Sequence, residues 1–189
     1  MKLSKIGLKI PTLCLSICAG MVFYTGIALG AEKVIMRASV FELSISLDEL
    51  QNFAETGEVS ASLRDVFRTA KVNRQIARQA LTQPVPMNLL VLDRTLNSPL
   101  GEAWLDEMGK IVHTRVNQAN REALRAALIL SASKDNQISL LEVIENYPTS
   151  EVLVQADRLA SAYQQLSRFG LSLPQLGSSS KESRSNFKF

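Results

Sequence analysis

The sequence predicts a mainly helical α+β domain, in which about six short helices form a compact bundle and a small sheet covers one side. Three observations lead to this fold class. Apolar residues recur every three or four positions through most of residues 47–169, as in amphipathic helices. Residues that cap or stop helices stand at the ends of these stretches. Alternation typical of a strand is confined to short segments, mainly in residues 33–46.

Residues 1–30 are typical of a secretory signal peptide. Three lysines and no acidic residue precede a nearly uncharged apolar run, and small residues at Ala28–Ala31 offer cleavage positions. We therefore expect an exported protein. A leader that stays in place as an N-terminal membrane anchor is the alternative, because about twenty apolar residues can span a bilayer. Lipid attachment at Cys18 is disfavoured because the preceding Ile17 is not small.

The composition after the leader excludes several classes of protein. The chain has 21 Lys and Arg against 18 Asp and Glu, and the leader holds three of the basic residues, so the remainder is balanced. This balance argues against a nucleic-acid partner. Both cysteines, Cys14 and Cys18, lie in the leader. We therefore expect no disulfide, no cysteine nucleophile and no common zinc site in the remaining chain.

The domain begins with a hairpin and a well-marked helix. Residues 34–38 and 41–45 are expected to form two strands joined through Ser39 and Val40, and the second strand alternates as in a sheet with one wet face. Ser46 and Glu49 form a capping-box pattern for the first helix, and Gly57 is its expected stop.

A basic segment follows from Ser60 to Thr82. Its apolar residues share one side if the segment is helical, and Asn73 is a possible cap that would split it into two helices. Its basic residues gather on the other side: Arg64, Arg68, Lys71, Arg74 and Arg78. This face is either a solvated helix surface or a docking face for an anionic membrane surface or an acidic partner.

The middle of the chain contains two further candidate helices. Residues 88–96 fit either a short helix or a buried strand. Ser98 and Pro99 form a strong helix start, and the apolar spacing from Leu100 to Val112 predicts a helix that buries Trp104. His113 would then lie at the end of that helix, where its ring can interact with the helix dipole.

The last third of the domain is also predicted to be helical. Residues 120–132 and 139–146 are expected to form helices, and residues 152–154 can supply a third strand near 151–155. A final helix over 157–169 is expected to end at Gly170. The domain therefore spans residues 31–170, and the polar composition of residues 171–189 predicts a flexible tail. The expected core contains eight large side chains: Leu50, Phe53, Phe67, Trp104, Leu124, Leu128, Leu141 and Tyr163.

Several segments together resemble a known family. They are Phe53–Glu58, Ser98–Glu102, Ala123–Leu130 and Ser139–Ile144, the last followed by Tyr-Pro-Thr at 147–149. This ordered set resembles a cyanobacterial, exported domain family of unknown function that commonly carries the label "alpha/beta hydrolase". In some longer members a similar domain lies N-terminal to a hydrolase domain. The resemblance implies a cyanobacterial source and a periplasmic or thylakoid-lumenal location, and it supplies no catalytic residue.

The hydrolase label finds little support among the residues themselves. An alpha/beta hydrolase needs a Gly-x-Ser-x-Gly elbow between a strand and a helix, together with an acid and a histidine. The nearest segment, Gly170–Pro174, ends in proline and follows a predicted helix, and His113 is the sole histidine of the chain. A chain of this length with two or three strands is also too small for the doubly wound sheet that displays such a triad.

These observations favour a non-catalytic, exported accessory or interaction domain. Its expected partner is a hydrolase or another exported protein, with a membrane surface as a further possibility. We expect no cofactor and no metal ion. The alternatives are a hydrolase or esterase acting in its own right, and a helical domain that binds a lipid or another apolar ligand.

Overall fold

The computed structural model describes residues 30–116 and 119–185. The predicted signal peptide therefore lies outside the described residues, except for Gly30. Within the described residues the chain forms eight α-helices, one 3₁₀ helix and two small sheets. The predicted mainly helical α+β class is confirmed, with two more helices than the six expected.

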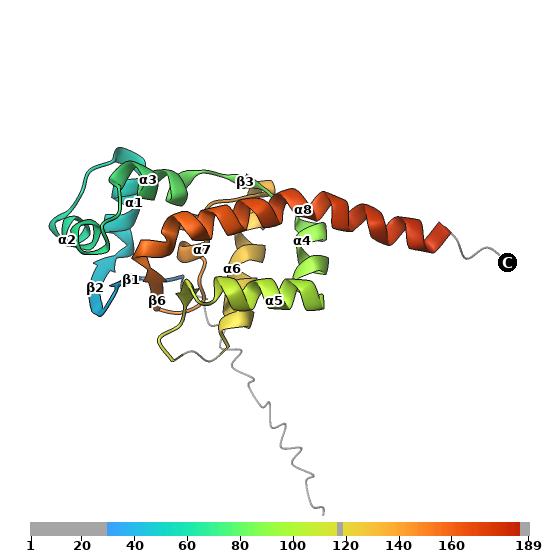
Figure 1. The fold of residues 1–189 in the computed structure, drawn as a ribbon, viewed down its shortest axis with the longest axis horizontal. Helices are drawn as coiled ribbons and strands as arrows, with labels where there is room; N and C mark the ends of the chain where they lie inside the picture. The colour runs from blue at the N-terminus through green and yellow to red at the C-terminus, as the bar shows by residue number, and fades with distance from the viewer. Residues whose placement is uncertain (1–29, 117–118, 186–189) are drawn as a thin grey trace, which may run out of the picture.

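A four-stranded sheet lies at one end of the molecule (Figure 1). Its order is β2 (Phe41–Ser46), β1 (Lys33–Ala38), β6 (Glu151–Gln155) and β4 (Val112–His113). β1 runs parallel to β6 and antiparallel to β2, and β4 runs antiparallel to β6. The predicted hairpin and third strand are confirmed, whereas β4 was not predicted.

The two faces of this sheet differ in character. Side chains alternate along a strand, so the register assigns each residue to a face. Val34, Met36 and Val154 belong to the face that packs into the main core. The opposite face carries Arg37 beside Glu42, together with other polar residues. The exposed outer positions of β2 agree with the wet face that its alternation predicts.

Three helices follow the hairpin: α1 (Leu47–Thr56), α2 (Ala61–Ala70) and α3 (Arg74–Thr82). Ser46 and Glu49 form the predicted capping box, and Gly57 ends α1 with a left-handed φ of 82°. Asn73 caps α3 with its side chain, so the basic segment is divided as that residue suggested. Figure 1 shows α2 and α3 running in different directions.

Two helices then form a tight corner: α4 (Leu89–Leu96) and α5 (Pro99–Met108). Residues 88–96, which fitted either a short helix or a buried strand, therefore form a helix with Asn88 as its cap. Ser98 caps α5 and Pro99 occupies its first turn, as predicted. A Cβ atom at Gly101 would lie 2.0 Å from the carbonyl oxygen of Thr95, so only glycine permits this close approach.

The remaining helices are α6 (Asn120–Asp135), α7 (Leu140–Glu145), the 3₁₀ helix η1 (Ala156–Arg158) and α8 (Leu159–Ser185). A second, two-stranded sheet pairs β3 (Val85–Pro86) with β5 (Gln137–Ile138) and was not predicted. α8 passes across the molecule and packs against α3 and α4. In Figure 1 its C-terminal part extends beyond α4 and α5.

The predicted end of the last helix at Gly170 is wrong. α8 continues through Gly170 to Ser185, so residues 171–185 of the predicted tail are helical. Gly170 serves packing and not capping, because a Cβ atom there would lie 2.7 Å from Cγ1 of Val85. Its missing side chain lets α8 pass close to β3.

The core agrees with most of the predicted residues. Leu50, Phe53, Phe67, Leu124 and Leu128 are buried. The other three predicted residues are partly buried and pack against the core: Trp104, Leu141 and Tyr163. Two apolar residues of the predicted helical patterns, Ile76 and Leu100, do not join the core, since their side chains are 52% and 57% exposed. The buried side is formed by Ala77, Ala80 and Leu81 on the helix of Ile76, and by Gly101, Leu105 and Met108 on the helix of Leu100.

Candidate functional site

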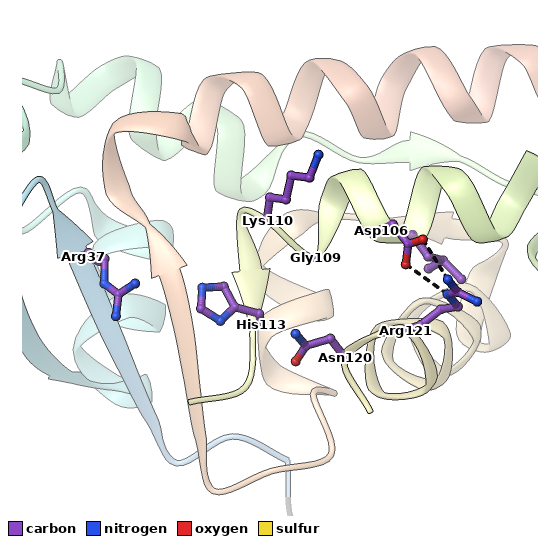
Figure 2. Close-up of a pocket in the computed structure, with 8 residues that line it drawn as sticks. Arg37, Asp106, Gly109, Lys110, His113, Asn120 and Arg121 are labelled. Atoms are coloured by element: carbon purple, nitrogen blue, oxygen red, sulfur yellow. Dashed lines mark hydrogen bonds and ion pairs between the residues drawn. The ribbon is translucent and has the colours of Figure 1, made fainter. Parts of the chain in front are cut away.

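A pocket of about 420 Å³ lies between the sheet and the helices α5 and α6 (Figure 2). It draws residues from four elements or their ends, including β1, β4, the end of α5 and the start of α6. Its lining is mostly polar: Arg37, Leu105, Asp106, Gly109, Lys110, His113, Asn120 and Arg121. Because it contains the only histidine of the chain, it is the place to look for acid–base chemistry.

His113 is the central polar group of this pocket. Its Nδ1 atom lies 2.9 Å from the carbonyl oxygen of Thr114. A carbonyl oxygen only accepts, so Nδ1 carries the hydrogen in the neutral ring and Nε2 is the acceptor. Figure 2 shows the ring lying between Arg37 and Asn120.

The predicted position of His113 at a helix end is wrong. α5 ends at Met108, and His113 lies in β4, where it pairs with Leu153 of β6. Helical spacing continues to Ile111 and Val112 in the sequence, but both are buried beside the sheet instead of on the helix. The predicted interaction of His113 with the dipole of that helix is therefore also wrong.

The carboxylate in the pocket is held by an arginine. Nε and Nη2 of Arg121 donate to the two oxygens of Asp106 at 3.0 and 2.7 Å, and Nη1 donates to Glu102 at 3.1 Å. The hydrogen bond from Arg121 lowers the pKa of Asp106, and the same bond raises the pKa of Arg121. Asp106 is thus a fork-to-fork partner of Arg121 and is not placed to orient His113.

A chain of charges lies on the sheet face beside the pocket. Arg37 donates through Nε to Glu42 at 3.0 Å, while Arg115 lies 3.7 Å from Glu42 and 3.4 Å from Glu151. The hydrogen bond from Arg37 is the main cause that lowers the pKa of Glu42, and the charges of Arg37, Arg115 and His113 add to it. These contacts join side chains of β1, β2 and β6 to Arg115, which lies two residues after the end of β4.

This charged face also contains two buried apolar residues. Ile35 pairs with Leu153, and Leu153 pairs with His113, so all three share the charged face. Ile35 is 5% exposed and Leu153 is 1% exposed, although neither belongs to the main core. The uninterrupted apolar run Val152–Val154 in β6 is the sequence signal for a strand buried on both faces, and all three residues are buried.

Among the described residues that line the pocket, none is a serine, threonine or cysteine. The neighbouring Thr114 hydroxyl donates to Oδ1 of Asn120 at 2.7 Å. Ser172, the serine of the nearest elbow-like segment, lies within α8 and donates to the carbonyl of Phe169 at 2.7 Å. It is on a helix and not on a strand-to-helix turn.

The predicted interaction face is divided between two helices. Arg64 and Arg68 lie on α2, where Arg68 pairs with Asp65 at 2.7 Å. Lys71 caps α2 with a left-handed φ of 54°. Arg74 is exposed at the start of α3, whereas Arg78 donates to the carbonyls of Ala54 and Glu55 at 2.8 and 2.6 Å. The five residues therefore do not line one helix, and Arg78 has a structural partner.

Three of the segments that carry the family resemblance include the start or end of a helix, and the fourth, Ala123–Leu130, lies within α6. Residues 53–58 contain Phe53, whose ring lies 5.1 Å from that of Phe67, and the end of α1 that Arg78 holds. Residues 98–102 form the α4–α5 corner around Gly101. The hydroxyl of Thr149 donates to the carbonyl of Glu151 and shapes the entry to β6. The contacts of these segments therefore shape the ends of helices and the entry to β6.

Among residues 30–116 and 119–185, no helix combines the length and apolarity needed to cross a membrane. In the same part of the chain, no three His, Cys, Asp or Glu side chains gather as ligands for a metal ion.

The comparison with known proteins gives one result. A family model described as "alpha/beta hydrolase of unknown function (DUF1400)" matches residues 30–155. The match covers both sheets and the helices α1 to α7, and it ends before α8. We found no match among curated proteins and none among solved structures.

Proposed function

Since the chain belongs to the family described as alpha/beta hydrolase of unknown function (DUF1400), we propose that it is an exported, non-catalytic interaction domain that works beside a separate hydrolase. Export is proposed from the basic start and apolar run of residues 1–30. The family is described as a hydrolase, whereas this chain forms a small α+β domain with a four-stranded and a two-stranded sheet. A domain that works beside a hydrolase is consistent with both.

The observation that carries the proposal is the incomplete chemistry around His113. The ring offers Nε2 as a base, but the described residues that line its pocket carry no hydroxyl or thiol for that base to activate. Asp106, the carboxylate among these described lining residues, is committed to Arg121. A nucleophile and its base normally lie within hydrogen-bond reach of each other. This arrangement favours binding over catalysis.

The surface best suited to docking is the charged face of the four-stranded sheet. Arg37, Glu42, Arg115 and Glu151 offer both charge signs within a short distance, and the pocket opens beside them. Mixed charges of this kind select a partner with the complementary pattern more than they add raw affinity. The preformed pocket would receive one projecting side chain of that partner.

Co-purification from the source organism tests the docking face. Ser44 shares this face because it pairs with Ile35, and it is exposed. We expect Ser44→Arg to lose the proteins that co-purify with the tagged wild-type chain. Ser133→Arg is the matched control, because Ser133 is an exposed serine near the end of α6. Identical partner profiles for wild type and Ser44→Arg would contradict the proposal.

A hydrolase acting in its own right is the second candidate. The description of the family and the acceptor Nε2 of His113 favour it. It predicts ester hydrolysis that depends on His113, and the serine that an elbow-like segment would offer is Ser172. Hydrolysis by the wild-type chain that is absent in both His113→Ala and Ser172→Ala would support this candidate.

A further inference from the structure

A second pocket shares no lining residue with the His113 pocket. It has a volume of about 530 Å³, within the range of ligand sites. It lies between β3, the start of α4, the turn after α6 and the middle of α8. Its lining residues are Pro86, Met87, Asn88, Val91, Asn136, Gly170 and Leu173.

The floor of this groove is apolar and uncharged. Met87 and Leu173 are almost fully buried, and Val91 is half-buried. None of the seven lining residues carries a charge, in contrast to the five titratable residues around the His113 pocket. A groove of this composition favours the apolar part of a ligand.

Two asparagines give the groove a specific hydrogen-bonding character. Oδ1 of Asn88 accepts from the backbone N–H of Val91 at 3.2 Å, and Oδ1 of Asn136 accepts from the N–H of Leu89 at 3.1 Å. Each side-chain oxygen is thus committed to the backbone. The amide NH₂ group is the part that each asparagine can offer to a ligand, and it only donates.

The backbone fixes the position of these two donors. The N–H of Met87 donates to the carbonyl oxygen of Asn136 at 2.7 Å, which joins the two sides of the groove. Asn136 has a left-handed φ of 59°, a conformation that asparagine adopts more readily than most residues. Gly170 permits α8 to pass within packing distance of Val85 and Met87. The groove is therefore held by backbone contacts and not only by flexible side chains.

We propose that this groove binds an acyl chain, with its apolar tail against Met87, Val91 and Leu173 and its carbonyl or carboxylate oxygen accepting from the amides of Asn88 and Asn136. The proposal goes beyond the docking function of the sheet face.

Two fluorescent probes separate the apolar floor from the donors. Diphenylhexatriene is apolar and has no hydrogen-bond acceptor, whereas cis-parinaric acid is a fatty acid with a carboxyl head. We expect both probes to bind the full chain saturably. Val91→Phe fills the groove and is expected to abolish the binding of both.

The double variant Asn88→Asp, Asn136→Asp tests the donors. Aspartate keeps the oxygen that accepts from the backbone, so both local hydrogen bonds are retained. It replaces each NH₂ donor with an oxygen, so cis-parinaric acid should bind at least about tenfold more weakly. Diphenylhexatriene should bind within about twofold of wild type. Asn52→Asp, an exposed change on α1, is the matched control and should leave both affinities unchanged.

Three outcomes would overturn the proposal: no saturable binding of either probe, wild-type binding by folded Val91→Phe, or an equal loss of both probes in the double aspartate variant. If Val91→Phe does not fold, a fatty acid with a diazirine in its tail gives an independent test on the wild-type chain. Photolabelling within residues 86–91 or 170–173 is expected. Labelling confined to other segments would contradict the site.

Discussion

Arg78 of α3 holds the end of α1, and its partner Ala54 lies 24 residues earlier in the chain. Its guanidinium donates to the carbonyls of Ala54 and Glu55 at the end of α1. It also lies beside Gly57, where an added Cβ atom would be 3.5 Å from Nη1 of Arg78. The last carbonyls of a helix lack partners and carry partial negative charge, so a cation stabilises them. The sequence predicted a basic face here, but a charge pattern alone does not reveal which cation has a partner.

Arg78→Gln should therefore destabilise the protein. Hydrogen bonds that involve a charged group contribute about 1.5–3 kcal/mol, so we expect the free energy of unfolding to fall by about that amount. Arg74→Gln, an exposed change on the same helix, should alter it by less than about 0.5 kcal/mol. Urea denaturation of both variants checks this. Equal effects of the two changes would show that Arg78 is only a surface charge.

Gly101 is the second residue whose role follows from contact distance. Gly101→Ala places a Cβ atom 2.0 Å from the carbonyl oxygen of Thr95 and must separate α4 from α5. Overpacking of this kind typically costs about 1–3 kcal/mol in unfolding free energy. Gly109→Ala is the control, since its nearest carbonyl oxygen would lie 3.1 Å away and its φ is helical at −61°. Gly101→Ala with wild-type stability would contradict the tight corner.

At the scale of the element, the helix starts were the most predictable features. Ser46, Asn73, Ser98 and Ser139 all cap helices with their side chains. These signals are local, because the cap oxygen bonds to an N–H only two or three residues later. The helix end at Gly170 was not predictable in this way, since the same residue type serves as a cap or as a close-packing position.

The capping box of α1 predicts a pH dependence. Hydrogen bonding from the backbone of Ser46 is the main cause that lowers the pKa of Glu49 below its usual value of 4.5. The unfolded chain then binds a proton more readily than the folded chain. The stabilising contribution is complete above pH 4.5 and is lost as the pH falls through the lower, folded pKa.

Glu49→Gln removes this titration while an amide oxygen can still accept from Ser46. We expect the variant to lose less unfolding free energy than wild type when the pH is lowered through this range. Asp48→Asn, an exposed change in the same turn, is the control and should keep the wild-type acid dependence. Parallel acid profiles for wild type and Glu49→Gln would contradict the role of the capping box.

At the scale of the whole molecule, local periodicity was sufficient for the fold class but not for the site. The hairpin, the third strand and most core residues were predicted because each has its own pattern. The strands β3, β4 and β5 contain two residues each, and strands this short form only when they pair with another strand. The His113 pocket depends on β4, so its charged groups could not be brought together from the sequence. The salt bridges from Arg115 likewise reach Glu42 and Glu151, which are both far from it in the sequence.

We propose binding, and not hydrolysis, as the function of this chain. Its most direct test is the turnover of short-chain nitrophenyl esters by the purified full-length chain, measured beside His113→Ala and Ser172→Ala. We expect a wild-type rate that does not saturate with ester and that equals the rate of both variants. Saturable turnover by wild type that is lost in His113→Ala, with the variant still folded, would contradict the proposed function.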